Sequence, residues 1–237
     1  MEALFFLFWG SMEFGGFQKL SLLNYPDKMA CAVFTNGCNF RCPYCHNAEL
    51  VCGESRKIDP EQVFAYLNKR KDILDGICIS GGEPLMTDEV LSFMEKVKEL
   101  GYLIKLDTNG SYPERLQTVI TEGLADHVAM DVKNTEAKYA ETIGLPEAPL
   151  AKIRESIRFL KEGRIPYEFR TTVIREFHSA EDIREIAAEL SGADVWYLQP
   201  FRDAPEVPRK GLHAPDQMTM EEFGSNGNRF IKTIIRN

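Results

Sequence analysis

The chain has 237 residues, of which 44% are hydrophobic and 27% charged, so it is long enough to bury one sizeable core. Its formal net charge of -8 disfavours a surface for nucleic-acid phosphates or anionic lipid, which need clustered lysine and arginine. Six cysteines without a secretory signal are typical of metal ligands and buried thiols in a reducing cytoplasm. We therefore expect a cytoplasmic protein with no nucleic acid and no membrane among its partners.

The chain opens on an apolar stretch, Ala3–Trp9, that is too short to span a bilayer. Glu2 stands where a signal peptide would carry a basic residue. We expect residues 1–16 to be an N-terminal extension, either a docking segment or a non-native or disordered stretch before a true start at Met12. Residues 17–237 are expected to form a single domain.

Short β-rich runs then alternate with amphipathic helical patterns, which indicates parallel strands joined by crossover helices. The predicted strands are Ala30–Phe34, Gly76–Ser80, Leu103–Asp107, His127–Asp131, Glu168–Val173 and Val195–Gln199. The predicted helices are Asp59–Arg70, Thr87–Leu100 with Thr87 as its cap, Pro113–Glu122, Ala148–Lys161, Ala180–Leu190 and a closing one near Thr219–Ile234. Six such units are too few for an eight-stranded barrel, so the pattern predicts an α/β fold with an open, partial barrel.

Three cysteines, Cys38, Cys42 and Cys45, follow the first of these strands with the spacing C-x3-C-x2-C. Three thiolates at this spacing can bind three irons of an iron–sulfur cubane, and a fourth cysteine ligand is missing locally. An iron without a protein ligand keeps a position open for substrate. The alternatives are a zinc knuckle completed by His46 or Cys52, or three structural thiols. Cys31 and Cys78 lie inside predicted strands and are expected to be buried.

This cysteine array, with the aromatic Tyr44 before its last cysteine, resembles the signature of the radical S-adenosylmethionine (SAM) superfamily. The resemblance implies a partial (β/α)6 barrel, one [4Fe–4S] cluster held by Cys38, Cys42 and Cys45, and bound SAM. Tyr44 is counted among the cofactor-binding residues on the same ground.

Ser80–Pro84 follows the second predicted strand and resembles the Gly-Gly-Glu motif that contacts the SAM amino group in this family. Two glycines let the backbone approach a ligand closely, and a carboxylate can offset a cation. The resemblance assigns Gly81, Gly82 and Glu83 to SAM; the alternative is an ordinary turn.

Polar residues also end the third and fourth predicted strands, at the mouth where barrel active sites are built. Asp107 and Asn109, and then Asp131 and Lys133, resemble residues of pyruvate formate-lyase activase that contact the SAM ribose and carboxylate. The alternatives are an Asx turn with Asn109 for Asp107, and a solvated lysine for Lys133.

Arg170 lies within the fifth predicted strand, so its charge must be paired or point into the barrel. We expect it to meet the SAM carboxylate or an acid of the site; the alternative is an ion pair with Glu168 or another structural acid. At the sixth strand end, Gln199–Arg202 departs from the histidine of pyruvate formate-lyase activase, which puts the SAM contacts there in doubt.

The resemblance to one subgroup of this family is strongest in two stretches, Asn24–Lys28 and Cys45–Asn47. This subgroup contains the activases of anaerobic ribonucleoside-triphosphate reductase and their pyruvate formate-lyase relatives. The resemblance implies an anaerobic oxidoreductase that cleaves SAM and forms a glycyl radical on a partner, anaerobic ribonucleotide reductase being the first candidate. It also implies flavodoxin or ferredoxin as the electron donor.

Two rival functions stay open from the sequence. One is a radical SAM enzyme that acts on a small molecule, similar to carboxy-deazaguanine synthase. The proline-rich segment Phe201–Gln217 would favour this rival if it folded over the barrel mouth, and a polypeptide substrate if it were displaced. The other is a non-catalytic iron–sulfur or zinc-binding module.

Overall fold

The computed structural model describes residues 12–52 and 55–236, and the expected extension at residues 1–11 lies outside them. The chain forms two compact units. The first unit takes in the described residues up to Asn39, Glu49–Asp107 and Glu114–His127. The second unit takes in Phe40–Ala48, Thr108–Pro113 and the described residues from Val128 onward.

The strands of the first unit follow one another in the sheet in chain order. They are β1 (Phe14–Ser21), β2 (Ala30–Thr35), β3 (Gly76–Gly81) and β4 (Leu103–Thr108), the last ending one residue beyond the unit. β1 pairs antiparallel with β2, whereas β2, β3 and β4 are parallel. Side chains on both faces of β2 and β3 are fully buried, as parallel strands covered on both sides require.

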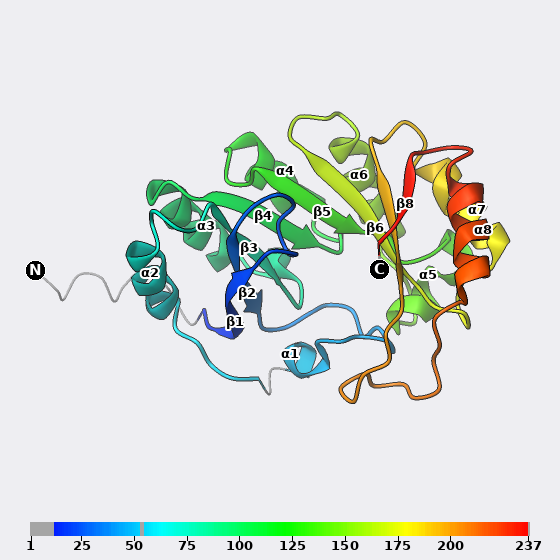
Figure 1. Ribbon diagram of the computed structural model, residues 1–237, viewed down its shortest axis with the longest axis horizontal. Helices are drawn as coiled ribbons and strands as arrows, with labels where there is room; N and C mark the ends of the chain where they lie inside the picture. The colour runs from blue at the N-terminus through cyan, green and yellow to red at the C-terminus, as the bar shows by residue number, and fades with distance from the viewer. Residues whose placement is uncertain (1–11, 53–54, 237) are drawn as a thin grey trace, which may run out of the picture. The chain divides into compact units, whose positions relative to one another are not determined.

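Helices of the first unit connect these strands (Figure 1). They are α1 (Ala48–Cys52), the 3-10 helix η2 (Pro84–Met86), and the helices α2 (Pro60–Lys69), α3 (Glu89–Glu99) and α4 (Pro113–Thr121). The first residues of α1 and α4 are the last residues of second-unit segments. The predicted start of α2 is confirmed, since Asp59 accepts a hydrogen bond from the Glu61 amide and Pro60 is the first helical residue. Thr87 does not cap α3: the residue before this helix is Asp88, whose carboxylate pairs with Arg115 instead.

The second unit has the strands β5 (His127–Asp131), β6 (Tyr167–Val173), β7 (Trp196–Pro200) and β8 (Thr233–Ile235), which are parallel throughout. β5 begins one residue before the unit does. The register places Asp131 beside Arg170, and Arg170 beside Tyr197. Because side chains alternate along a strand, Glu168, Arg170 and Thr172 share one face of β6. A row of polar side chains therefore lies on one face of this unit's strands.

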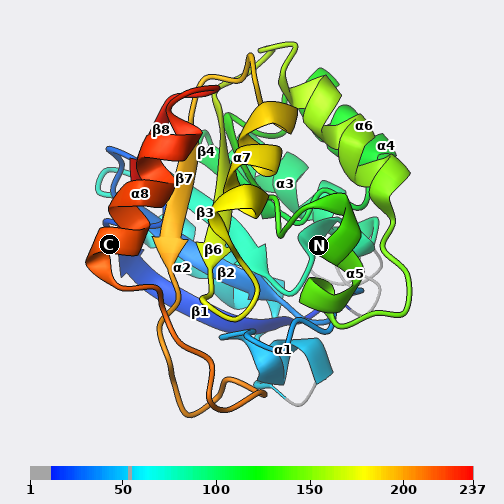
Figure 2. The same ribbon diagram turned by 90° about the vertical axis from the view of Figure 1, so that its right-hand side faces the viewer.

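Helices α5 (Glu136–Ile143), α6 (Leu150–Leu160), α7 (Ala180–Glu189) and α8 (Gln217–Gly227) belong to the second unit. Figure 2 shows α7 and α8 packed side by side over β7 and β8. α7 begins with a capping box, in which Ser179 and Asp182 satisfy each other's backbone amides. α5 ends at Gly144, whose positive φ of 68° suits glycine.

All six predicted strands are present, together with five of the predicted helices. The sixth helix prediction, Thr219–Ile234, is wrong beyond Gly227, because the chain turns there and forms β8. β1, α1 and α5 were not predicted, and β1 begins at Phe14, inside the range expected for an extension. Cys31 and Cys78 are buried, as predicted. Among the described residues, no helix is long and apolar enough to cross a bilayer.

Candidate functional site

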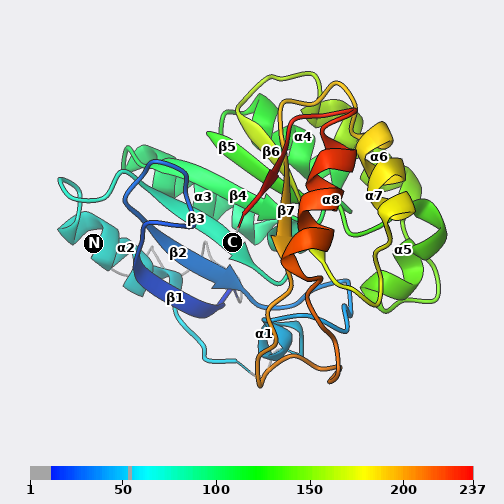
Figure 3. The same cartoon turned by 45° about the vertical axis from the view of Figure 1, so that its right-hand side comes forward.

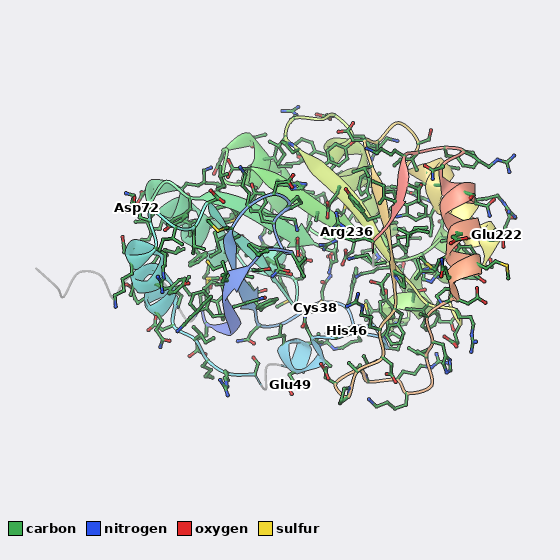
Figure 4. All side chains as sticks on the ribbon, in the orientation of Figure 1. Cys38, His46, Glu49, Asp72, Glu222 and Arg236 are labelled. Carbon is green, nitrogen blue, oxygen red and sulfur yellow. The ribbon has the colours of Figure 1, made fainter. Side chains whose placement is uncertain are left out.

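The cysteine array begins directly beyond the carboxyl end of β2. Cys38, labelled in Figure 4, belongs to the first unit, whereas Cys42 and Cys45 lie in the segment Phe40–Ala48 of the second unit. The Cys45 amide donates to the Cys42 carbonyl over 3.1 Å, which makes a tight turn. No disulfide joins the cysteines whose side chains are described, and within that part of the chain no three candidate ligands are already gathered as a metal site.

The Gly81–Glu83 loop packs its backbone onto the stretch that leads into Cys38. The Gly82 amide donates to the Thr35 carbonyl over 3.0 Å, and the Glu83 amide to the Gly37 carbonyl over 2.9 Å. A β-carbon on Gly82 would lie 1.7 Å from the Gly37 oxygen. Both glycines therefore permit a close approach of two backbones, which is a structural reason for them beside the expected contact with SAM.

Glu83 is almost completely buried, with 1% of its surface exposed. Its carboxylate oxygen Oε1 accepts a hydrogen bond from the Leu85 amide over 3.1 Å and so caps η2. The carboxylate that the sequence assigned to SAM thus also fixes the turn that follows the two glycines.

Asp107 and Asn109 stand at the end of β4. Asp107, in the first unit, pairs with Lys105, whose side chain is only 2% exposed. Asn109, in the second unit, accepts hydrogen bonds from the amide and the hydroxyl of Ser111 at 3.0 and 2.6 Å. The Asx turn here is therefore made by Asn109, and the lysine partner of Asp107 was not predicted.

The second unit brings Asp131, Lys133 and Arg170 together into an ion cluster at the end of β5. Asp131 accepts from the Lys133 ammonium and the Arg170 guanidinium, both over 2.9 Å. Burial alone would raise the pKa of Asp131, but the charges of Arg170 and Lys133 outweigh it and hold the pKa well below its usual range. Burial likewise would lower the pKa of Lys133, but Asp131 raises it well above its ordinary value. All three groups are therefore charged at neutral pH.

Arg170 does not pair with Glu168, which the sequence left as an alternative. Glu168 forms a two-point ion pair with Arg236, at 2.9 and 3.0 Å. The Arg236 guanidinium lies 3.5 Å from the centre of the Tyr197 ring, and Figure 4 shows this arginine beside β7 and β8. This pair could not be predicted from the sequence, because its partners are 68 residues apart.

Buried side chains hold the loop that carries Lys133, and none of them was predicted. Thr171 donates to the Val132 carbonyl over 2.6 Å, and the Tyr139 hydroxyl accepts from the Lys133 amide over 3.2 Å. His178 Nε2 lies 2.9 Å from the Lys133 carbonyl. Since its Nδ1 lies 3.2 Å from the Ile174 amide, we assign the ring proton to Nε2. In the sequence, His178 is the residue whose side chain could have indicated a buried polar network here.

Tyr44 is part of the turn between Cys42 and Cys45, and only 4% of its surface is exposed. It packs into an apolar cluster of the second unit, made with Ile174, Phe177, Phe201, Val207 and Leu212. Burial raises the pKa of its hydroxyl well above the ordinary value, against a smaller opposite effect of Lys133. The hydroxyl oxygen is buried and has no hydrogen-bond partner among the described residues.

The segment after β7 packs against the cysteine turn. It supplies Phe201, Val207 and Leu212 to the apolar cluster around Tyr44, and the Arg209 amide donates to the Pro43 carbonyl over 2.9 Å. Figure 1 shows it passing beyond the end of β7 before it returns to α8. The segment thus supports the cysteine turn from the same unit.

The sequence profile of the Radical SAM superfamily matches residues 32–190. The chain belongs to the radical SAM superfamily. It is also 34% identical over 228 residues to a Methanocaldococcus jannaschii protein that carries the provisional name glycyl-radical enzyme activating enzyme, with 93% of both chains covered. To the 7-carboxy-7-deazaguanine synthase of Thermococcus kodakarensis it is 28% identical, over 74% of this chain and 75% of that protein.

A solved structure supports the fold of this radical SAM protein. The radical SAM methyltransferase from Sphaerobacter thermophilus superposes with a TM-score of 0.73 and 18% identity, covering 92% of this chain and 68% of the other. The predicted α/β fold of the partial-barrel type is thus confirmed. Membership implies that the protein works with a [4Fe–4S] cluster and SAM.

Proposed function

We propose that this radical SAM enzyme is an activase that forms a glycyl radical on a partner enzyme. The observation that carries the proposal is the likeness to the M. jannaschii protein, which extends over 93% of both chains. An activase of this kind would act on a glycine of a large partner, with anaerobic ribonucleotide reductase as the first candidate. Flavodoxin or ferredoxin would supply the electron.

Cys38, Cys42 and Cys45 are the proposed ligands of the cluster. Their chemistry fits, because three thiols within eight residues can bind three irons and leave the fourth for SAM. A reduced cluster bound by these cysteines would supply the electron for cleaving SAM into methionine and a 5′-deoxyadenosyl radical, and that radical would take the glycine hydrogen. The protein orients the reactants and keeps water away from them.

The ion cluster of the second unit is the proposed holder of the SAM carboxylate. Asp131 neutralises one of two neighbouring cations, so Lys133 and Arg170 together keep an excess positive charge. The thirteen-percent exposure of the Lys133 side chain leaves little water to compete for a bound carboxylate.

The remaining predicted contacts are proposed on the family resemblance. Glu83 would accept from the SAM amino group beside the Gly81–Gly82 backbone, and Asp107 and Asn109 would face the ribose. Tyr44, a residue of the cysteine turn, would line the same site, and its ring is already fixed by packing.

A small-molecule radical SAM reaction is the second candidate. The likeness to 7-carboxy-7-deazaguanine synthase favours it, although that likeness is lower in identity and covers less of the chain than the first.

The test is anaerobic reconstitution with iron and sulfide, followed by SAM and dithionite. We expect 5′-deoxyadenosine from the wild type and from Cys78→Ala, which removes a thiol buried in β3, but none from Cys42→Ala. Adding candidate glycyl-radical enzymes should then yield a radical doublet in electron paramagnetic resonance. If the loaded, reduced wild type leaves SAM intact, the proposal fails; if it cleaves SAM but no partner gains a radical, the small-molecule reaction becomes the better account.

A further inference from the structure

The Tyr44 hydroxyl differs from the hydroxyls of three other buried tyrosines in the described chain. The Tyr102 hydroxyl donates to the Leu67 carbonyl over 2.7 Å, and those of Tyr139 and Tyr167 accept from backbone amides over 3.2 and 3.3 Å. The Tyr44 hydroxyl is equally buried and has no partner in the described residues. A buried hydroxyl without a hydrogen bond destabilises the folded state, so a partner for it is expected to arrive with a ligand.

The surroundings of Tyr44 restrict what that partner can be. The ring packs into a cluster of apolar side chains, with Phe177 at 6.2 Å between ring centres. The groups that act electrostatically on its hydroxyl are Lys133, Cys42, Asp131 and the Tyr139 hydroxyl. Lys133 is a donor already engaged with Asp131, and Asp131 is shared between two cations. The Tyr139 hydroxyl already accepts from the Lys133 amide over 3.2 Å. This leaves sulfur at Cys42, whose side chain packs against the same apolar cluster, as the acceptor that a bound cluster would make more negative.

We propose that the Tyr44 hydroxyl donates a hydrogen bond to sulfur of the cluster bound at Cys42, either the cysteine thiolate or a bridging sulfide. The inference rests on the proposed cluster ligation. Sulfur becomes more negative when a cluster is reduced, so a donor stabilises the reduced state and raises the reduction potential. Tyr44 is thus a positioning residue that makes the cluster easier to reduce.

The ring itself is held independently of its hydroxyl. Five apolar neighbours fix it from the segments 174–177 and 201–212, so replacing the hydroxyl by hydrogen leaves the packing in place. Tyr44→Phe therefore removes the donor alone. Tyr102→Phe is the matched control, because it removes an equally buried hydroxyl that bonds to the backbone of α2 in the first unit.

The experiment compares the reconstituted wild type, Tyr44→Phe and Tyr102→Phe in a redox titration followed by electron paramagnetic resonance, with iron measured on each. We expect a more negative midpoint potential in Tyr44→Phe at unchanged iron content, and no shift in Tyr102→Phe. Equal potentials in all three fully loaded proteins would overturn the inference.

A second measurement uses the wild type alone and covers the case in which Tyr44→Phe loses its iron. In heavy water, pulsed electron paramagnetic resonance should detect an exchangeable deuteron that is strongly coupled to the reduced cluster. Absence of this deuteron would overturn the inference. Neither readout requires SAM cleavage or a partner, so failure of the activase proposal is recognised separately by missing 5′-deoxyadenosine or a missing glycyl radical.

Discussion

His178 is a buried histidine that holds the backbone of Lys133. Its ring bridges the Lys133 carbonyl and the Ile174 amide, and it can do both only as the neutral Nε2 tautomer. Burial lowers its pKa below the ordinary value of about 6.5. The neutral ring is therefore part of the folded state, and protonation acts against it.

The sign of the resulting pH dependence is fixed by this lowered pKa. Above about pH 6.5 the histidine is neutral in the folded and the unfolded chain, so its full contribution to stability is present. As the pH falls, the unfolded chain takes up a proton first, and the free energy of unfolding drops by up to about 1.4 kcal/mol per pH unit. We expect urea unfolding between pH 7.5 and 5.5 to show this loss in the wild type and a smaller one in His178→Gln.

The control for this prediction is His46→Gln, since His46 is exposed. The pH dependence of this variant is the reference for replacing a surface histidine by glutamine. Equal slopes in the wild type and in His178→Gln would mean that His178 titrates alike in both states.

The partner of a charged strand residue is an example of what the sequence could not predict. Arg170 was expected to need a partner, because a charge in a covered strand has to be paired, and the structure supplies Asp131. The choice between Asp131 and Glu168 depended on β5 and β6 registering Asp131 beside Arg170. Asp131 and Arg170 are 39 residues apart, and the register that pairs them is not encoded locally. The need for a partner was therefore predictable, and its identity was not.

At the scale of elements, the close contact between the β3–η2 turn and the stretch after β2 positions the first cysteine. Gly81 and Gly82 lie against Thr35 and Gly37 with no room for a β-carbon on either. Figure 3 shows β2 and β3 side by side, so the two connections leave from the same edge of the first unit.

Gly82→Ala is expected to be strongly destabilising for this reason. Its β-carbon would lie 1.7 Å from a backbone oxygen, which cannot rotate away, so the two loops must separate. We expect a loss of more than about 3 kcal/mol in urea unfolding, at the large end for overpacking, together with lower iron content after reconstitution.

Gly163→Ala is the matched control, because a β-carbon there meets nothing within 4 Å although φ is +67°. Only the left-handed backbone is strained, at a cost of about 1–2 kcal/mol. Similar losses for both variants would show that the two loops are free to separate.

The wrong end of the last predicted helix has a local cause that the sequence did contain. Gly224, Asn226, Gly227 and Asn228 weaken a helix, although the apolar spacing continues past them. Asn228 then bonds both the amide and the carbonyl of Thr233, at 2.9 and 3.1 Å, and so fixes the start of β8. The glycine and asparagine residues therefore predict the end of this helix better than the apolar spacing does.

At the scale of the whole molecule, the order of strands along the chain was predictable and the polar contacts were not. Parallel strands in chain order place the residues that follow β2, β3 and β5 at strand ends, which is why Cys38, Glu83 and Lys133 could be chosen as candidates. The Glu168–Arg236 pair joins β6 to the last described residue, and such a contact follows only from the complete fold.

Binding of SAM provides a test on the whole chain. A ligand that binds only the folded protein, at 100 times its dissociation constant, adds about 2.7 kcal/mol of stability. For a domain of this size that corresponds to an increase in Tm of about 5–10 °C. We expect this increase in the reconstituted protein under anaerobic conditions, because the proposed iron and the ion cluster around Lys133 would hold SAM jointly. Cys42→Ala should show little or none of it. An equal increase in both proteins would place the affinity for SAM in the side chains alone and assign the iron to the redox step only.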